Sequence, residues 1–322
     1  MKTEALTQRV IAGGRIEKEE ALWLYRQPVA ELSRLADEIR QKRCGNGFDL
    51  CTILNGKSGR CPENCRFCAQ SAHHPTGVEE YPLLSVEKIV AEGKKQEAKG
   101  ALRYAVVTSC RCLSEEELEQ LCEAMERLHR ETKLGLCVSC GLLTEEQYRR
   151  LRAAGVSRIH NNLETSERYF PQICTTHRFS DKVAAIRAAQ AAGLSVCSGG
   201  IMGMGETAED RIDLALSLRE LGITSVPINL LNPIAGTPLA GRQPLSEEEL
   251  RRIVAVYRFL LPEAAIRLAG GRGLLEDKGE GCFCGGANAA ISGDMLTTAG
   301  ITLETDRSLL HGLGYEVRLQ DE

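Results

Sequence analysis

The chain has 322 residues, 43% of them hydrophobic, and its 40 Lys and Arg against 44 Asp and Glu give a formal net charge of −4. This length and apolar content suffice for one large core, and the charge balance offers no broad basic field for nucleic acid. No apolar run approaches the roughly 20 residues that span a bilayer. The start, MKTEALTQRVIAGG, lacks the apolar core of a signal peptide. We therefore expect a cytoplasmic protein that binds neither membrane nor nucleic acid.

The 14 cysteines are the most informative feature of the composition. Thiols stay reduced in the cytosol, so these cysteines favour metal or redox chemistry over a disulfide framework. We expect them to mark the functional site and to require handling of the protein without oxygen.

The N-terminal part of the chain predicts short helices. Apolar side chains recur at helical spacing in residues 18–25 and 29–39. We interpret residues 1–45 as a helical extension that covers one end of the domain formed by residues 46–322.

From residue 48 onward, short apolar segments alternate with amphipathic helices. The segments are near-continuous apolar runs, as expected for strands of a parallel sheet covered on both faces. Helix starts at Ser114 and Ser246 have capping-box form, because a Glu follows each serine at the third position. This alternation predicts an α/β fold, a (β/α)8 TIM-type barrel, with its chemistry at the C-terminal ends of the strands. The predicted strands are residues 48–54, 103–109, 133–139, 158–163, 194–199, 225–231 and 265–269, with a weaker one near 288–292.

The first predicted strand leads into a loop with the spacing C-x3-C-x2-C, formed by Cys61, Cys65 and Cys68. Three thiolates at this spacing can bind three corners of one iron–sulfur cube and leave the fourth iron open for a substrate. Polar neighbours argue against core filling by inert thiols. A zinc site is the other alternative, but it needs four N or S ligands, and only Cys65 and Cys68 form a pair at the usual spacing. The spacing therefore favours a [4Fe–4S] cluster.

This loop resembles the signature of the radical S-adenosylmethionine (radical SAM) enzymes. The longer run of residues 51–72 is similar to that of the biotin synthases within this superfamily. Further motifs of that family follow in the same order, and the resemblance extends from the N-terminal helices to near the C-terminus. These motifs are NLETS at 162–166, CSGGI at 197–201, GET at 205–207, SVPIN at 225–229 and GGAN at 285–288.

The resemblance implies an enzyme that converts dethiobiotin to biotin. S-adenosylmethionine would bind the open iron and yield a 5′-deoxyadenosyl radical, which abstracts hydrogen from dethiobiotin, and an auxiliary iron–sulfur cluster would donate the inserted sulfur. The resemblance also implies a reducing electron donor protein and a homodimer. Two alternatives stay open. One is another radical SAM barrel enzyme, similar to a hydrogenase maturase and acting on a different small molecule, and the other is a non-enzymatic metal- or redox-sensing protein.

The resemblance also identifies residues for the auxiliary cluster. In biotin synthases this is a [2Fe–2S] cluster held inside the barrel by three cysteines and an arginine. Cys137 and Cys197 match two of the cysteine positions, and Arg267 matches the arginine position. The remaining cysteine position falls at Ala105, and a methyl group cannot bind iron. The usual cluster is therefore in doubt for this chain.

Two other thiols, Cys110 and Cys112, lie just beyond the second predicted strand. We hypothesise that one of them joins Cys137 and Cys197 in an altered auxiliary cluster, for which four irons is the candidate nuclearity. Side chains alternate between the two faces of a strand, so this arrangement requires the chain to turn by Ser109.

Asn162 and Asn229 match family residues that hydrogen-bond the ureido ring of dethiobiotin. An amide both donates and accepts hydrogen bonds, which suits a neutral urea. The alternative for both is turn formation at a strand end. His160 replaces an amide of the family motif, and it is either a substrate contact or a core histidine.

Four residues match positions that surround S-adenosylmethionine in the family. Glu164 stands at an aspartate position and would bind the ribose hydroxyls or the ammonium group. Lys182 stands at an arginine position and would face the methionine carboxylate, without the bidentate fork of arginine; a solvated helix face is its alternative. Phe67 and Ile201 would pack on the adenine, or serve as ordinary packing.

Overall fold

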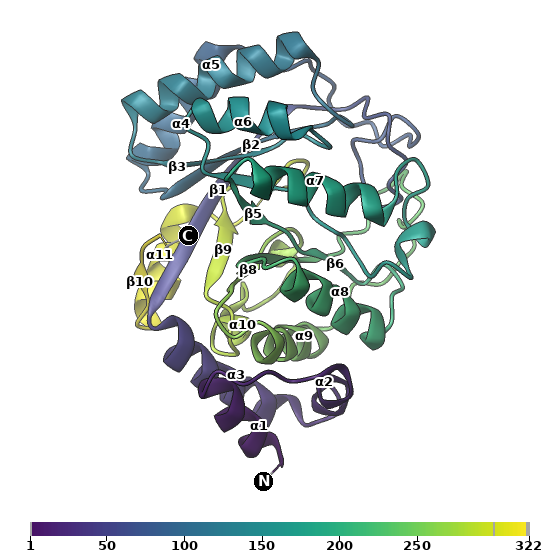
Figure 1. Cartoon of the computed structure of the whole chain (residues 1–322), viewed down its shortest axis with the longest axis vertical. Coiled ribbons are helices and arrows are strands. Elements are labelled where there is room, and N and C mark those ends of the chain that lie inside the picture. Colours follow the sequence, from purple (N-terminus) through teal and green to yellow (C-terminus); the bar gives the residue numbers. More distant parts are fainter. Residues whose placement is uncertain (1, 299, 320–322) are drawn as a thin grey trace.

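The computed structural model describes residues 2–298 and 300–319, so residues 299 and 320–322 of the predicted barrel domain lie outside the described residues (Figure 1). Its strands form a 10-stranded sheet in which every pairing is parallel. The order β1-β2-β3-β4-β5-β7-β8-β9, with β9 pairing back to β1, closes a barrel of eight strands, which confirms the predicted fold class. The strands are β1 (Gly47–Lys57), β2 (Arg103–Thr108), β3 (Gly135–Ser139), β4 (Arg158–His160), β5 (Ser195–Cys197), β6 (Gly200–Met202), β7 (Ser225–Leu230), β8 (Ala265–Leu268), β9 (Ala289–Ser292) and β10 (Glu316–Val317).

Helices surround this barrel (Figure 1). Most starts are capped by a side chain, and Ser114 and Glu117 form the predicted capping box. At Ser246 only half of the box forms, because the Glu249 carboxylate accepts hydrogen bonds from Tyr25 and Arg211 instead. The α-helices are α1 (Lys2–Ile11), α2 (Lys18–Leu24), α3 (Val29–Cys44), α4 (Val86–Ala98), α5 (Glu115–Glu131), α6 (Glu145–Ala153), α7 (Phe179–Ala191), α8 (Ala208–Glu220), α9 (Glu247–Leu260), α10 (Glu280–Phe283) and α11 (Leu303–Gly312); short 3₁₀ helices span Phe170–Gln172 and Arg272–Leu274.

Each predicted strand corresponds to one barrel strand, and the weaker one near 288–292 is β9. The sequence missed β6 and β10. The predicted strand 194–199 ends at Cys197 and resumes as β6, because a Cβ on Gly199 would lie 1.9 Å from the Pro227 carbonyl oxygen. The chain thus bends where it approaches β7 most closely, and only glycine fits there.

The helical extension packs against the outer helices, and the Cys44 thiol at the end of α3 also donates to Pro262 O at 3.3 Å, in the loop that leads into β8. Helix α3 packs on α9, and α2 packs on α8 and α9. The reason lies in α9, where every residue from Ile253 to Leu260 is buried. A helix that is buried on all its faces over two turns needs cover on its outer face as well as its inner face. The sequence-based boundary at residue 46 stays a prediction.

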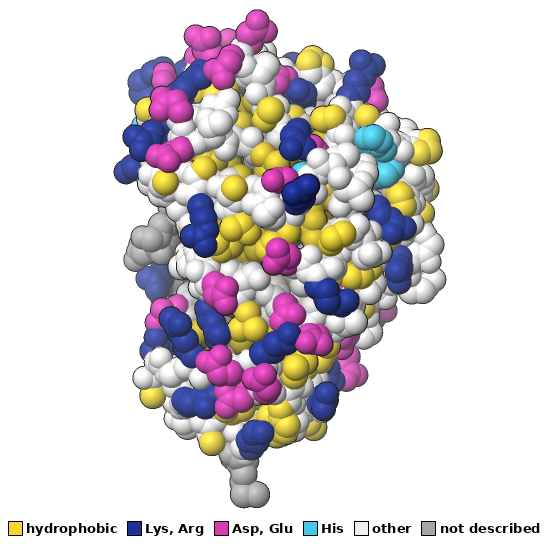
Figure 2. Space-filling view, turned by 45° about the vertical axis from the view of Figure 1, so that its right-hand side comes forward, with side chains coloured by type: hydrophobic (Ala, Val, Ile, Leu, Met, Phe, Trp, Pro, Cys, Tyr) yellow, Lys and Arg dark blue, Asp and Glu magenta, His cyan; other side chains and the backbone are white. Residues whose placement is uncertain are grey.

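The surface agrees with the charge balance. Acidic and basic side chains are interspersed over the face drawn in Figure 2, and hydrophobic side chains gather across its middle. Within residues 2–298 and 300–319, no helix is both long and apolar enough to cross a membrane.

Asp210 joins helix α8 to the loop after β4. Its fully buried carboxylate accepts hydrogen bonds from Ser166 Oγ at 2.6 Å, Arg168 Nε at 3.0 Å and Thr207 N at 2.8 Å. Burial raises the pKa of Asp210, but these hydrogen bonds outweigh it and lower the pKa to about 2. The carboxylate therefore stabilises the fold at neutral pH, and this contribution is lost as the pH falls from about 4 through 2.

We predict that Asp210→Ala lowers the free energy of unfolding by about 2–3 kcal/mol at pH 7, the usual effect of removing hydrogen bonds to a charged group. The difference in the free energy of unfolding between the variant and wild type should become smaller at pH 3, because residue 210 of the unfolded wild-type chain is already largely protonated there. Urea unfolding at both pH values measures it. An equal difference at pH 7 and pH 3 would contradict the role of the ionised carboxylate.

Candidate functional site

The three signature cysteines lie in the loop between β1 and α4, at the C-terminal end of β1. Backbone hydrogen bonds fold this loop back on itself, from Cys61 N to Gln70 O at 3.0 Å, from Ala72 N to Cys61 O at 2.8 Å and from Cys68 N to Cys65 O at 3.0 Å. The three thiols are free and partly buried. The hydrogen bond to Cys174 and burial raise the pKa of Cys65, and burial raises that of Cys68. Smaller contributions from Cys68 to Cys65 and from Cys61 to Cys68 indicate that the three sulfurs are neighbours. The loop therefore gathers the predicted ligand set at the barrel mouth.

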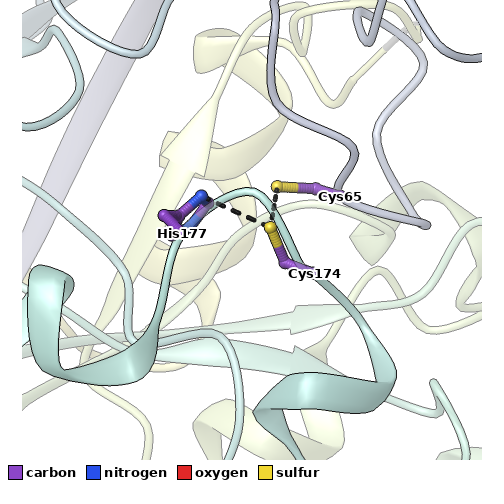
Figure 3. A group of neighbouring side chains, drawn as sticks. All are labelled: Cys65, Cys174 and His177. Atoms are coloured by element: carbon purple, nitrogen blue, oxygen red, sulfur yellow. Dashed lines mark hydrogen bonds between the residues drawn. The ribbon is translucent and has the colours of Figure 1, made fainter.

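A second loop, between β4 and α7, meets the signature loop at Cys65. Figure 3 shows Cys65 from the first loop facing Cys174 and His177 from the second. The Cys174 Sγ lies 3.7 Å from the Cys65 Sγ and 3.3 Å from His177 Nδ1, and His177 Nδ1 also contacts the Glu63 carboxylate. Backbone bonding from Arg66 N to Ile173 O at 2.9 Å holds the two loops together. Sequence reasoning gave Cys174 no role, because 109 residues separate it from Cys65.

The contact shifts the pKa values of the two thiols in opposite directions. The hydrogen bond with Cys65 and the neighbouring His177 lower the pKa of Cys174 to about 3, although burial opposes them. The same hydrogen bond, with burial, raises the pKa of Cys65. In the metal-free protein Cys65 therefore keeps its proton and donates it in the hydrogen bond to Cys174. Iron would have to displace this proton to bind Cys65.

This contact yields a prediction for the cluster-free protein. Mild oxidation with diamide should join Cys65 to Cys174, because two thiols at 3.7 Å need little movement to form a disulfide, and diamide accepts the two electrons and two protons. Peptide mapping without reduction would detect the cross-linked pair. Cluster-loaded protein is the control and should resist, and cross-links confined to Cys61 and Cys68 would contradict the prediction.

Glu164 and Lys182 bring opposite charges to the signature cysteines. Burial raises the pKa values of Cys61 and Cys68, and at Cys65 it adds to the hydrogen bond with Cys174. The Lys182 ammonium opposes these shifts at Cys61 and Cys65, and the Glu164 carboxylate adds to the shift at Cys68. Lys182 Nζ also donates to Asn161 Oδ1 at 3.0 Å, and the lysine is partly buried. Burial raises the pKa of Glu164, and Lys182 opposes this effect.

Strand β6 assembles the other predicted contacts. Ile201 N donates to Glu164 O at 2.9 Å, and Ile201 pairs with Asn229 across the sheet. The Asn162 Oδ1 accepts from Gly199 N at 3.0 Å, while Asn229 donates to Gly200 O at 3.1 Å and accepts from Gly270 N. Both amides therefore hydrogen-bond the backbone of neighbouring segments at the barrel mouth. They retain further donors and lone pairs for a ligand. Phe67 is partly buried against the core.

Cys137 and Cys197 lie in the barrel interior, where both are buried. Cys197 Sγ accepts from Ser225 Oγ at 3.3 Å. Burial alone would raise its pKa, but a hydrogen bond to His160 and the charges of Arg267 and Arg158 lower it to about 6. His160 thus supports a thiol in the interior. Cys197 is consequently suited to bind metal as a thiolate at neutral pH.

Arg267 is also buried, and its charge acts on Cys197. Its Nη1 donates to the carbonyl oxygens of Asp49 at 3.1 Å and Ala290 at 3.0 Å, and its Nη2 lies 3.0 Å from Asp49 Oδ2. Its buried Nε has no hydrogen-bond partner among the described residues. Ala105 is in register with Cys137, so the family position that lacks a thiol does lie beside a predicted ligand.

The extra thiols lie elsewhere. Cys110 Sγ contacts the Thr108 hydroxyl at 3.2 Å and the Cys140 carbonyl at 3.8 Å, and Cys112 is exposed and bridges to Gly141. The chain does leave the strand after Thr108, and these contacts of Cys110 and Cys112 lie at the end of β2 and in the loop after β3. Their role as auxiliary-cluster ligands stays a prediction.

The closed barrel with a three-cysteine loop beyond its first strand is the arrangement of a radical SAM enzyme. The model of the radical SAM superfamily matches residues 57–218, and that of the biotin and thiamin synthesis associated domain matches residues 227–316. The chain is 54% identical over 319 residues to the biotin synthase of Brachyspira hyodysenteriae, with 99% of this chain and 96% of the relative covered. Identity to the biotin synthase of Akkermansia muciniphila is 52% over 318 residues, with 99% of each covered. The chain belongs to the biotin synthase family.

Solved structures share the fold at lower identity. Methylornithine synthase superposes with a TM-score of 0.83 at 20% identity, covering 98% of this chain and 97% of that one. The [FeFe]-hydrogenase maturase from Carboxydothermus hydrogenoformans gives 0.82 at 17% identity, covering 98% and 78%. At these identities the likeness concerns the fold alone. The hydrogenase-maturase alternative is therefore not favoured over the family that matches along the whole sequence.

Proposed function

We propose that this chain converts dethiobiotin to biotin by radical hydrogen abstraction and sulfur insertion. The observation that carries the proposal is 54% identity to a biotin synthase across 99% of the chain. Two separate sets of thiols support it, one at the barrel mouth and one in the interior. The reaction needs both, since the radical and the inserted sulfur have different sources.

The loop at the mouth fits a [4Fe–4S] cluster with S-adenosylmethionine. Cys61, Cys65 and Cys68 would hold the cluster, as free, neighbouring thiols. When bound, the cluster and S-adenosylmethionine supply a 5′-deoxyadenosyl radical. Lys182 would neutralise the methionine carboxylate. Glu164 Oε2 is buried without a hydrogen-bond partner, so it has acceptor capacity for ribose hydroxyls or the ammonium group.

The interior fits an auxiliary iron–sulfur cluster, which would supply the inserted sulfur. Cys137 and Cys197 would be ligands, and Arg267 would be a further ligand, as the family resemblance implies. Asn162 and Asn229 would hydrogen-bond the ureido ring between the two clusters, with Phe67 and Ile201 packing on adenine. We place the enzyme in the cytoplasm as a homodimer that receives electrons from a reducing donor protein, as the family resemblance implies.

The test is turnover by anaerobically reconstituted protein with S-adenosylmethionine and a reductant, with and without dethiobiotin. We expect 5′-deoxyadenosine and biotin to form only when dethiobiotin is present. Asn229→Asp, which replaces the amide NH2 donor group by a carboxylate oxygen, should raise the KM for dethiobiotin more than it lowers kcat. Cleavage of S-adenosylmethionine that ignores dethiobiotin would favour another radical SAM substrate, and absence of cleavage would favour a metal- or redox-sensing protein.

A further inference from the structure

The interior of the barrel contains a third thiol that the family pattern does not assign. The β1–β2 register pairs Ile53 with Ala105, and the β2–β3 register pairs Ala105 with Cys137. Side chains two positions apart on a strand share a face. Cys51, two residues before Ile53, therefore projects to the same side of the sheet as Ala105 and Cys137.

That side is the inside of the barrel. Tyr104, on the opposite face of β2, donates its hydroxyl hydrogen to Ile89 O in the outer helix α4. The register from β3 onward pairs Cys137 with Arg158 and then His160 with Cys197, which keeps Cys197 on the inner face. Following the pairings around the barrel thus brings Cys51, Cys137 and Cys197 to one interior surface.

The surroundings of Cys51 are charged, unlike those of a cysteine that merely fills a core. Its side chain is 7% exposed, and its Sγ lies 4.0 Å from Asp49 Oδ1. The guanidinium groups of Arg267, Arg103 and Arg158 also act on this thiol. Structural cysteines behave as small hydrophobes and prefer apolar neighbours. Cys51 instead lies beside one carboxylate and among three guanidinium groups, which core filling does not require. Burial raises the pKa of Cys51 to about 11, so a metal ion would displace its proton on binding.

The charge balance of the interior points the same way. The buried Asp49 carboxylate lies among the guanidinium groups of Arg267, Arg103 and Arg158, with Arg267 Nη2 at 3.0 Å and Arg158 Nη1 at 3.6 Å from its Oδ2. Buried charge is costly unless it is compensated. Thiolates bound to iron supply negative charge at this point, and Cys51 is a buried thiol among these same groups.

We propose that Cys51 replaces the thiol missing at Ala105 and, with Cys137 and Cys197, holds the auxiliary iron–sulfur cluster beside Arg267. The neighbouring strand thus supplies the ligand that β2 lacks. The proposal rests on the proposed function, because it concerns the cluster that would donate sulfur. It assigns Cys110 and Cys112 to the surrounding loop rather than to the cluster.

The experiment uses protein in which Cys61, Cys65 and Cys68 are all alanine, so that iron reports on the auxiliary site. After anaerobic reconstitution, iron and sulfide per chain and the Mössbauer spectrum are compared for this protein with and without Cys51→Ala. Cys51→Ser keeps the shape of the side chain, and Cys110→Ala and Cys112→Ala are the matched controls. We expect Cys51→Ala to lose most of the iron, Cys51→Ser to give an altered spectrum, and both controls to keep iron and spectrum.

Full iron and an unchanged spectrum in Cys51→Ala would overturn the proposal, as would absence of iron in the parent protein. Circular dichroism of the cluster-free variants, with Cys51→Ser as the conservative change, separates loss of a ligand from loss of the fold. Biotin formation by the wild type is measured beside them. An intact auxiliary cluster in Cys51→Ala, together with biotin formation by the wild type, would refute the ligand and leave the proposed function standing. Iron loss in Cys51→Ala, with no biotin formation by the wild type, would support the ligand and refute the proposed function.

Discussion

Replacing Cys61, Cys65 and Cys68 together by alanine is expected to abolish cleavage of S-adenosylmethionine. Changes to residues that merely orient metal ligands reduce affinity or activity by about 10–100-fold, so removing three ligands should exceed ~100-fold. The signal of the [4Fe–4S] cluster should disappear from the Mössbauer spectrum, and the remaining iron should belong to the auxiliary site. Formation of 5′-deoxyadenosine under reducing conditions, followed by chromatography, measures the activity.

The control removes thiols that lie away from both sites. Cys122 is on the outer helix α5, and Cys284 is exposed near the end of α10. The double variant Cys122→Ala, Cys284→Ala should retain iron content and cleavage close to wild type. Equal losses in both proteins would mean that cysteine number, rather than the signature loop, determines cluster assembly.

Replacing Asp49 by asparagine is expected to lower the free energy of unfolding of the cluster-free protein by about 3–5 kcal/mol, the usual effect of removing one partner of a buried ion pair. Asp49 is fully buried, and its Oδ2 faces Arg267 and Arg158. Burial raises the pKa of Asp49, but the surrounding guanidinium groups have a larger opposite effect and lower it overall, with Arg267 first among them. The neutral amide would leave these charges without their carboxylate.

The pH dependence follows from the sign of this shift. Because the pKa of Asp49 is lowered in the fold, its contribution is complete at neutral pH and is lost as the pH falls below the ordinary carboxyl range. Asp213→Asn, which breaks the partly exposed pair with Lys18 at 2.7 Å, is the control and should change stability by less than about 1 kcal/mol. Urea unfolding at pH 7 measures both variants. A loss in Asp49→Asn no larger than in the control would contradict the argument.

Local pattern alone was enough for much of this protein. The alternation of apolar runs and amphipathic helices predicts each barrel strand, because burial on both faces leaves a continuous apolar signal that needs no long-range information. The spacing of Cys61, Cys65 and Cys68 predicts a cluster loop for the same reason, since all three ligands come from one short segment. The break at Gly199 and the two-residue β10 escaped prediction because close backbone approach and short strands leave little trace in composition.

The interior of the barrel required tertiary structure. Alternation along the first predicted strand puts Asp49 and Cys51 on one face, but only the register around the closed sheet brings that face to Cys137 and Cys197. Cys174 gains its contact with Cys65 only when two loops more than a hundred residues apart meet at the mouth. Local sequence thus determined the elements and the signature loop, because their signals are carried by neighbouring residues. The fold decided which distant thiols and charges share a site, because closing the sheet fixes distances that no spacing along the chain contains.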